Sequence, residues 1–217
     1  MSTARPDALL FDWDNTLVDT WPVIHEALNH TLRAMNHPEW TFAETKQRVR
    51  LAAREAFPRL FGDDWERAAA IFYEKIRAAH IERLAVVEGA AEMLEALQGH
   101  GFFLGVVSNK RGELLRAEAE HLGWDRFFGR LIGANDAERD KPDPVAVHAA
   151  LAGSGLKAGK NIWFVGDTDT DMECAANAGC TAVLIRAEPP TKSEFDGHPP
   201  AWYFRSCAEL AAYFGGT

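Results

Sequence analysis

Two aspartates, Asp12 and Asp14, stand one residue apart directly after the apolar run of residues 8–11. A short apolar run of this kind predicts a buried strand, and two carboxylates at its end are costly to keep without a compensating role. In an open α/β sheet, ligands bind at the carboxyl edge of the strands. The pair therefore suggests a nucleophile, a second acid and a metal gathered in one place.

Three later predicted strands are also followed by polar residues that could do chemistry: Ser108 and Asn109 after residues 102–107, Lys141 beyond residues 131–134, and Asp167 with Asp171 after residues 162–165. The carboxyl ends of neighbouring strands lie side by side, so these residues should converge on Asp12 and Asp14. Crowded carboxylates repel one another unless a cation joins them. Oxygen ligands favour Mg²⁺, which also holds substrate phosphates, so the sequence predicts a Mg²⁺ site.

The segment between the first strand and residue 84 is predicted to be helical throughout. An apolar face with helical spacing begins at Trp21, and Thr41 with Glu44 forms a capping-box pattern for a second helix. We expect that second helix to continue through Phe57, and a third to begin after Asp63 or Asp64. We expect no strand here, which makes residues 18–84 an all-α cap inserted after the first strand.

From Val87 onward, strands and helices alternate. Further strands are predicted at residues 181–185 and 201–204, and helices at residues 88–98, 110–122, 144–151 and 169–178 and after Ser206. Strands separated by helices predict right-handed crossovers and a parallel, doubly wound sheet. The predicted fold is thus a Rossmann-like α/β core, residues 1–17 and 85–217, with the helical cap above the carboxyl edge of its sheet.

Composition limits the kind of partner that this protein can bind. The net charge of −9 over 217 residues disfavours nucleic acid and anionic membranes. Three cysteines without metal-type spacing are typical of reduced thiols rather than of a disulfide framework. No signal-peptide or membrane-spanning pattern is visible, so we expect a cytoplasmic protein, monomeric or homodimeric, that acts on a small molecule.

The four polar sites, in this order and with a helical insert after the first, resemble the motifs of the haloacid dehalogenase superfamily. The matching stretches are residues 12–17, Ser108-Asn109, Lys141-Pro142 and residues 166–171. The outline is most similar to the phosphoglycolate-phosphatase-like branch, and the resemblance covers nearly the whole chain. These motifs are specific for the superfamily but poorly specific for the substrate.

The resemblance implies a division of roles between the carboxylates. Asp12 and Asp167 would ligate Mg²⁺ through their side chains, and Asp14 through its backbone carbonyl. Asp12 would also be the nucleophile that forms an aspartyl phosphate. The Asp14 side chain would then be free to protonate the leaving oxygen and later to take a proton from water.

The remaining motif residues would hold the phosphate. Ser108, the backbone N–H groups near Asn109 and the Lys141 ammonium would neutralise its charge. Asp171 would support Lys141 or a metal-bound water from the second layer of contacts. Thr16 would add a hydrogen bond to the site. Each aspartate also has a purely structural interpretation, as a turn former or a helix cap.

Basic residues of the cap leave two interpretations open. Lys46, Arg50 and Arg54 recur every four residues, and like charges at that spacing mildly repel. Arg50 and Arg54 could bind a carboxylate or second phosphate of the substrate, or they could form a solvated face with Glu44 and Glu55 as partners. Many similar caps carry a glycine-containing loop near residue 50, which this chain lacks, and this weakens a transfer of phosphoglycolate specificity.

The leading hypothesis is a Mg²⁺-dependent phosphatase acting on a small soluble phosphomonoester. Asp14 argues against a haloacid dehalogenase, which works without this second acid. A sugar-phosphate mutase, a pyrophosphatase or a nucleotidase would share the same motifs. A catalytically idle domain that binds a metabolite or a protein is the alternative outside enzymes, but such a domain would typically have lost one of the motif acids, and none is missing here.

Overall fold

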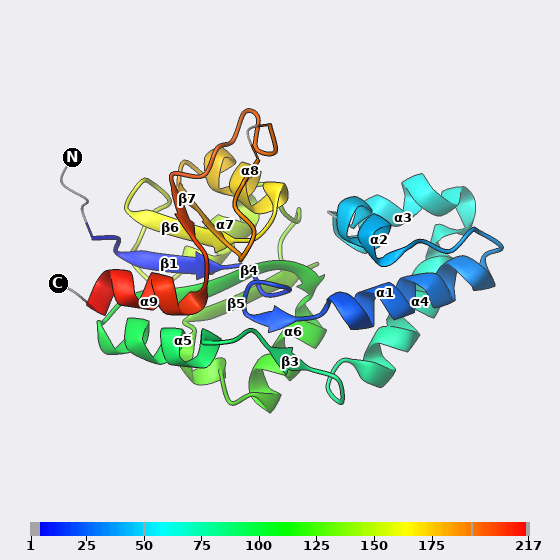
Figure 1. Cartoon of the computed structure of the whole chain (residues 1–217), viewed down its shortest axis with the longest axis horizontal. Coiled ribbons are helices and arrows are strands. Elements are labelled where there is room, and N and C mark those ends of the chain that lie inside the picture. Colours follow the sequence, from blue (N-terminus) through cyan, green and yellow to red (C-terminus); the bar gives the residue numbers. More distant parts are fainter. Residues whose placement is uncertain (1–4, 50, 192, 216–217) are drawn as a thin grey trace.

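A computed structural model describes residues 5–49, 51–191 and 193–215 of the chain (Figure 1). The described residues form a six-stranded sheet in the order β5-β4-β1-β6-β7-β8, in which every neighbouring pair is parallel. Its strands are β1 (Ala8–Phe11), β4 (Phe103–Arg111), β5 (Arg130–Ala134), β6 (Ile162–Gly166), β7 (Thr181–Ile185) and β8 (Trp202–Phe204). The parallel, doubly wound sheet predicted from the sequence is confirmed.

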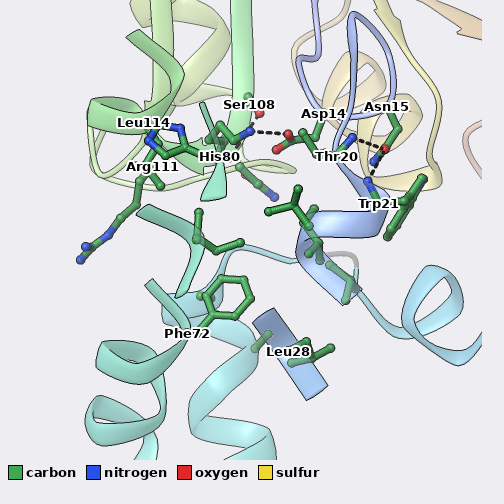
Figure 2. A pocket seen from close by; sticks show the side chains of 18 of the residues that line it. Asp14, Asn15, Thr20, Trp21, Leu28, Phe72, His80, Ser108, Arg111 and Leu114 are labelled. Atoms are coloured by element: carbon green, nitrogen blue, oxygen red, sulfur yellow. Dashed lines mark hydrogen bonds and ion pairs between the residues drawn. The ribbon is translucent and has the colours of Figure 1, made fainter. Parts of the chain in front are cut away.

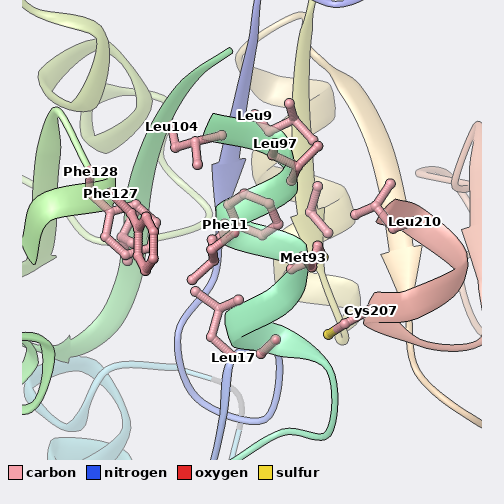
Figure 3. Packing of buried hydrophobic residues seen from close by; sticks show 14 of the residues in the cluster. Leu9, Phe11, Leu17, Met93, Leu97, Leu104, Phe127, Phe128, Cys207 and Leu210 are labelled. Atoms are coloured by element: carbon pink, nitrogen blue, oxygen red, sulfur yellow. The ribbon is translucent and has the colours of Figure 1, made fainter. Parts of the chain in front are cut away.

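Helices cover both faces of this sheet: α5 (Ala90–Gly99), α6 (Gly112–His121) and α9 (Cys207–Gly215) on one face, and α7 (Val145–Leu151) and α8 (Asp169–Asn177) on the other. Successive side chains of β1 point alternately into the two apolar layers on either face of the sheet. Leu9 and Phe11 point into the first layer, where they pack beside Met93 and Leu210 (Figure 3). Ala8 and Leu10 belong to the second layer. Both faces of β1 are therefore buried, as expected for a central parallel strand.

The cap consists of α1 (Trp21–Ala34), α2 (Phe42–Arg48), α3 (Ala53–Phe61) and α4 (Trp65–Ala79), with a 3₁₀ turn, η1 (Gly62–Asp64), before α4. Another 3₁₀ turn, η2 (Asp125–Phe127), follows α6 in the core. The cap has its own apolar cluster, in which Leu28, Leu32 and Phe57 are buried. Figure 1 shows the cap helices standing beyond the carboxyl end of the sheet. The predicted helical cap is confirmed as part of the fold.

Two strands in the connections between cap and core were not expected. β2 (Val18–Asp19) pairs antiparallel with β3 (Ala85–Val86). The prediction that no strand occurs from residue 18 to residue 84 is therefore wrong at Val18–Asp19. Two residues carry no periodic signal of their own, and this pairing exists only because the chain returns beside its point of departure.

The predicted second cap helix is in fact two helices. The capping box of Thr41 and Glu44 is present at the start of α2, but α2 ends at Arg48, and Val49 and Ala52 have extended backbones. Val49 and Ala53 nevertheless pack in the same apolar cluster. Periodicity alone could not separate one long helix from two short helices that bury their apolar residues together. Lys46 and Arg54 consequently do not share one helical face.

Two further features bear on the sequence expectations. Cys174, Cys180 and Cys207 are buried free thiols. No helix in the described ranges combines the length and the apolar character needed to cross a membrane.

Candidate active site

The carboxyl edge of the sheet brings together residues from β1 and its two neighbours. Asp12 follows β1, Ser108 lies in β4 and Asp167 follows β6. The backbone N–H of Asp12 donates to the Val165 carbonyl at 2.8 Å, which continues the parallel ladder by one residue. The chain runs from β1 to β4 on one side and later to β6 on the other, so this edge is a topological switch point. Ligand sites of doubly wound sheets lie at such points.

Lys141 provides the central cation. Its Nζ donates to Oδ1 of Asp12 at 2.6 Å and to Oδ1 of Asp171 at 2.7 Å. All three residues are buried. Burial by itself lowers the pKa of Lys141, but Asp12 and Asp171 together hold that pKa above its ordinary value. The ammonium group therefore stays charged in the site, as an anchor for anionic groups.

Lys141 only partly offsets the burial and mutual repulsion of the carboxylates of Asp12 and Asp167. Burial, opposed by Lys141 and reinforced by Asp171 and Asp14, raises the pKa of Asp12 to about 7. Burial, together with the carboxylates of Asp171 and Asp12, raises the pKa of Asp167 well above its usual range. Carboxylate oxygens of Asp12, Asp167 and Asp171 all lie within 4.8 Å of one another. A divalent cation would relieve this repulsion, and an all-oxygen donor set suits Mg²⁺.

Asp171 is held on both of its oxygens by the protein. Oδ1 accepts from Lys141, while Oδ2 accepts from the Thr168 backbone N–H at 3.0 Å and the Thr168 hydroxyl at 2.7 Å. Gly166 makes room for it, because a Cβ on Gly166 would lie 2.4 Å from Cγ of Asp171. This arrangement fits Asp171 as the support of Lys141.

The loop that carries Lys141 is fastened to the end of β4 by Asn109. The Asn109 side chain accepts from the Lys141 backbone N–H at 3.0 Å and donates to the Lys141 carbonyl at 3.2 Å. The Ser108 hydroxyl accepts from the backbone N–H of Lys110 at 3.2 Å. Asn109 thus has a loop-positioning role that the sequence pattern did not suggest.

Thr16 and Asn15 shape the turn after Asp14. The Thr16 hydroxyl donates to Oδ1 of Asp167 at 3.2 Å, so it orients a candidate metal ligand. Asn15 has a left-handed backbone, with φ of 64°, and its Oδ1 accepts from the backbone N–H groups of Thr20 and Trp21 at 3.2 Å each. Figure 2 shows these contacts at the start of α1. Asn15 therefore connects the turn after Asp14 to the first cap helix.

The sequence pattern did not indicate that Lys110 and Glu118 lie next to Asp14. Lys110 was expected to begin a helix, but β4 extends to Arg111, and Nζ of Lys110 donates to Oδ1 of Asp14 at 2.6 Å. The same Nζ donates to Oε2 of Glu118 at 2.7 Å. The spacing of Lys110 two residues after Ser108 could have indicated this contact, because alternate residues of a strand point to the same face of the sheet.

A cavity of about 180 Å³ lies between the cap and these residues. Asp14 and Ser108 lie on its core side, and Leu28 and Phe72 on its cap side (Figure 2). Arg54 is not among its lining residues; its Nε lies 2.5 Å from Oδ2 of Asp140. Arg50, the other cap arginine predicted to contact substrate, lies outside the described residues.

Sequence comparison places residues 9–185 in one family model, described as haloacid dehalogenase-like hydrolase. A pyrophosphatase of Halalkalibacterium halodurans is 28% identical over 96% of this chain and 97% of its own length. A 5'-nucleotidase of Pseudomonas aeruginosa is 29% identical over 94% and 92%, and a phosphoglycolate phosphatase of Caulobacter vibrioides is 33% identical over 82% and 78%.

Solved structures agree in fold. A haloacid dehalogenase-like hydrolase of Bacteroides fragilis superposes with a TM-score of 0.86 at 21% identity, covering 95% of this chain and 100% of that one. A predicted phosphoglycolate phosphatase of Haemophilus somnus gives 0.83 at 22% identity, covering 98% and 99%. The motif order, the acidic site at the sheet edge and the family match agree, and this chain belongs to the haloacid dehalogenase-like hydrolase family, in its phosphoglycolate-phosphatase-like branch.

Proposed function

We propose that this protein is a Mg²⁺-dependent phosphatase that hydrolyses a small soluble phosphomonoester through an aspartyl phosphate on Asp12. The observation that carries the proposal is the buried cluster of Asp12, Lys141, Asp171 and Asp167 at the switch point of the sheet. The cluster combines a nucleophilic carboxylate, a fixed cation and a place for a divalent metal. We further propose that the protein works in the cytoplasm, as a monomer or homodimer, on a small-molecule substrate. Its net charge of −9 supports the last point, because it disfavours binding to nucleic acid and to membrane surfaces.

Asp12 and Asp167, with the Asp14 backbone carbonyl, would hold the Mg²⁺ ion, which neutralises charge on the phosphoryl group when bound. An Asp12 oxygen attacks phosphorus as the bond to the leaving oxygen breaks, and the Asp14 carboxyl gives that oxygen its proton. Water then attacks the aspartyl phosphate and passes a proton to Asp14, which restores Asp12 and releases phosphate. Lys141 and Ser108 stabilise the negative charge on the phosphoryl oxygens throughout.

The cavity supports a small substrate. Its volume of about 180 Å³ is close to that of a cavity that takes up benzene, roughly 150 Å³. The phosphoryl group would lie at the polar core side, against Asp12 and Ser108. The organic part would face Trp21, Phe72 and other cap residues, which would shield the reaction from bulk water.

The test is phosphate release from a panel of phosphomonoesters, with Mg²⁺ and with a chelator, for wild type and Asp12→Asn. We expect Mg²⁺-dependent release by wild type, at least about 10³-fold slower in Asp12→Asn. Asp125→Asn, in η2, is the matched control and should behave as wild type. Absence of release from every substrate, or equal rates in wild type and Asp12→Asn, would refute the proposal.

Two relatives favour specific alternatives within the same chemistry, because the pyrophosphatase and the 5'-nucleotidase align along nearly their whole length. Pyrophosphate and nucleoside monophosphates therefore belong in the panel beside phosphoglycolate. A sugar-phosphate mutase would isomerise a sugar phosphate faster than it hydrolyses one. An idle binding domain would bind phosphate esters without releasing phosphate.

The cap arginines are proposed as contacts to a second anionic group of the substrate. For Arg54 this requires the side chain to leave Asp140, to which it is ion-paired. Arg50→Ala and Arg54→Ala should lower the apparent affinity for substrates with a second anionic group, such as the carboxylate of phosphoglycolate, more than for simple alkyl phosphates. Arg59→Ala, on the same cap, serves as the charge-matched control. Unchanged substrate ranking in both variants would assign these arginines to the surface.

A further inference from the structure

Glu118 is a fully buried carboxylate outside the motifs. It lies on α6, and three side chains from different parts of the chain form hydrogen bonds with it. Nε1 of Trp13 and Nζ of Lys110 each lie 2.7 Å from Oε2, and Nδ1 of His80 lies 3.0 Å from Oε1. A buried carboxylate with so complete a set of partners is firmly fixed in place.

Lys110 connects this fixed carboxylate to the proposed acid/base. Its Nζ contacts Glu118 on one side and Asp14 on the other, at 2.7 Å and 2.6 Å. Burial lowers the pKa of Lys110, but the two carboxylates outweigh burial and raise it, so the side chain remains a cation. A lysine stem has four rotatable carbons, and a single contact would leave its ammonium group mobile. With two contacts, the ammonium group becomes a fixed point against which Asp14 is held.

His80 brings the cap into the same set of contacts. It directly follows α4, where the cap chain turns back toward β3 and the core. Its side chain is 10% exposed and contacts Glu118, and Figure 2 shows it on the Ser108 and Leu114 side of the cavity rather than beside Phe72. Trp13 reaches Glu118 from the core side, from its place between Asp12 and Asp14. Glu118 therefore joins the returning end of the cap to the turn that carries both catalytic aspartates.

We propose that Glu118 is a positioning residue that fixes the Asp14 side chain through Lys110. His80, at the end of α4, makes the position of Asp14 depend on how the cap packs against the core. The proposal rests on the proposed function, in which Asp14 protonates the leaving oxygen. Neither Glu118 nor Lys110 touches the phosphoryl group in this role. In kcat/KM, which reports the steps up to transfer of the phosphoryl group to Asp12, their effect should appear only where the leaving oxygen needs a well-placed proton donor.

Dependence on the leaving group separates this role from a general structural one. p-Nitrophenolate leaves without protonation, whereas an alkoxide does not, so a displaced Asp14 should slow alkyl phosphates selectively. For Lys110→Met we expect kcat/KM to fall about 10²-fold with ethyl phosphate and less than about tenfold with p-nitrophenyl phosphate. Glu118→Gln should give the same pattern, and His80→Ala a weaker one. His30→Ala, on the exposed side of α1, should change neither substrate.

A double-mutant cycle provides the decisive measurement. If Lys110 acts through Asp14, then Lys110→Met in an Asp14→Asn background should cost less than about twofold with ethyl phosphate. Equal losses on both substrates, or additive losses in the double variant, would overturn the inference while wild-type hydrolysis still upholds the phosphatase. Absence of hydrolysis by wild type would contradict both the proposed phosphatase function and this inference. If Glu118→Gln does not fold, Lys110→Met and Trp13→Phe carry the same comparison.

Discussion

Nζ of Lys141 lies 2.6 Å from Oδ1 of Asp12, a residue 129 positions earlier in the chain. The side chains are only 3% and 10% exposed, and Asp171 is the second partner of the same ammonium group. Each of these charges depends on the others, because a buried ion without its partner is far more costly than the assembled group. The proposed nucleophile and the proposed phosphate anchor are therefore parts of one electrostatic unit.

Replacing Lys141 with methionine should damage both stability and activity. The change leaves Asp12 and Asp171 buried without their cation, so we expect a loss of about 3–5 kcal/mol in the free energy of unfolding, measured with urea and a chelator at pH 8. Arg139→Ala is the control, since Arg139 is 71% exposed and its pair with Asp143 is long, at 3.4 Å. That change should cost less than about 1 kcal/mol. Equal losses in the two variants would contradict the buried unit.

Magnesium should stabilise the folded protein against heat. A ligand at a hundredfold excess over its Kd adds about 2.7 kcal/mol, which for a chain of this size raises Tm by roughly 5–10 °C. Asp167→Asn removes a proposed ligand and should abolish most of this rise. Glu95→Gln, which removes one negative charge from an exposed pair with Arg126, should retain it. A Mg²⁺-induced shift of the same size in Asp167→Asn would exclude Asp167 as a ligand.

Gly166→Ala should disturb the site through Asp171. The added methyl would lie 2.4 Å from Cγ of Asp171, a distance that forces the carboxylate away from Lys141. We expect a stability loss of about 1–3 kcal/mol and a fall in kcat of at least tenfold. Gly99→Ala has open space around its new Cβ at the end of α5 and should be neutral or stabilising by up to about 1 kcal/mol. Wild-type kinetics in Gly166→Ala would show that Asp171 does not need its present position.

Asn15 should matter for its amide as well as for its left-handed backbone. Asn15→Gly keeps the backbone freedom but loses both hydrogen bonds to the start of α1, so we expect a loss of about 1 kcal/mol. Asn36 also has positive φ, of 57°, and it is exposed after α1. Asn36→Gly should therefore be close to neutral. Denaturation curves of the two variants test the difference, and equal curves would assign Asn15 a conformational role alone.

Local sequence patterns could predict the core and the order of its chemical groups. Each core strand contains a short apolar run, and a polar residue follows that run in β1, β4 and β6. The capping box at Thr41 is equally local, since Thr41 and Glu44 satisfy each other's backbone N–H groups within one turn. Parallel topology then follows from the alternation of strands and helices, because crossovers of one hand place the strand ends together.

Other features depend on partners that are distant in the chain. On either side of the break between α2 and α3, Val49 and Ala53 pack in one apolar cluster of the cap. The pairing of β2 with β3 requires the whole insert to return to its origin. The extension of β4 through Lys110 and Arg111 likewise depends on β5, whose Ala134 is the register partner of Arg111. Local periodicity cannot predict these features, because each involves contacts with residues that are distant in the chain.

The sequence by itself therefore determined the α/β class, the helical cap and the identities of Asp12, Asp14, Ser108, Lys141 and Asp167 as candidates. Only the tertiary structure decided that Asn109 fastens the Lys141 loop and that Glu118 and Lys110 stand behind Asp14. The motif residues come after the apolar runs of the core strands, so their places are encoded locally. Glu118 meets Trp13 across 105 positions and His80 across 38, and such a meeting depends on how α6 and the cap are packed against the sheet.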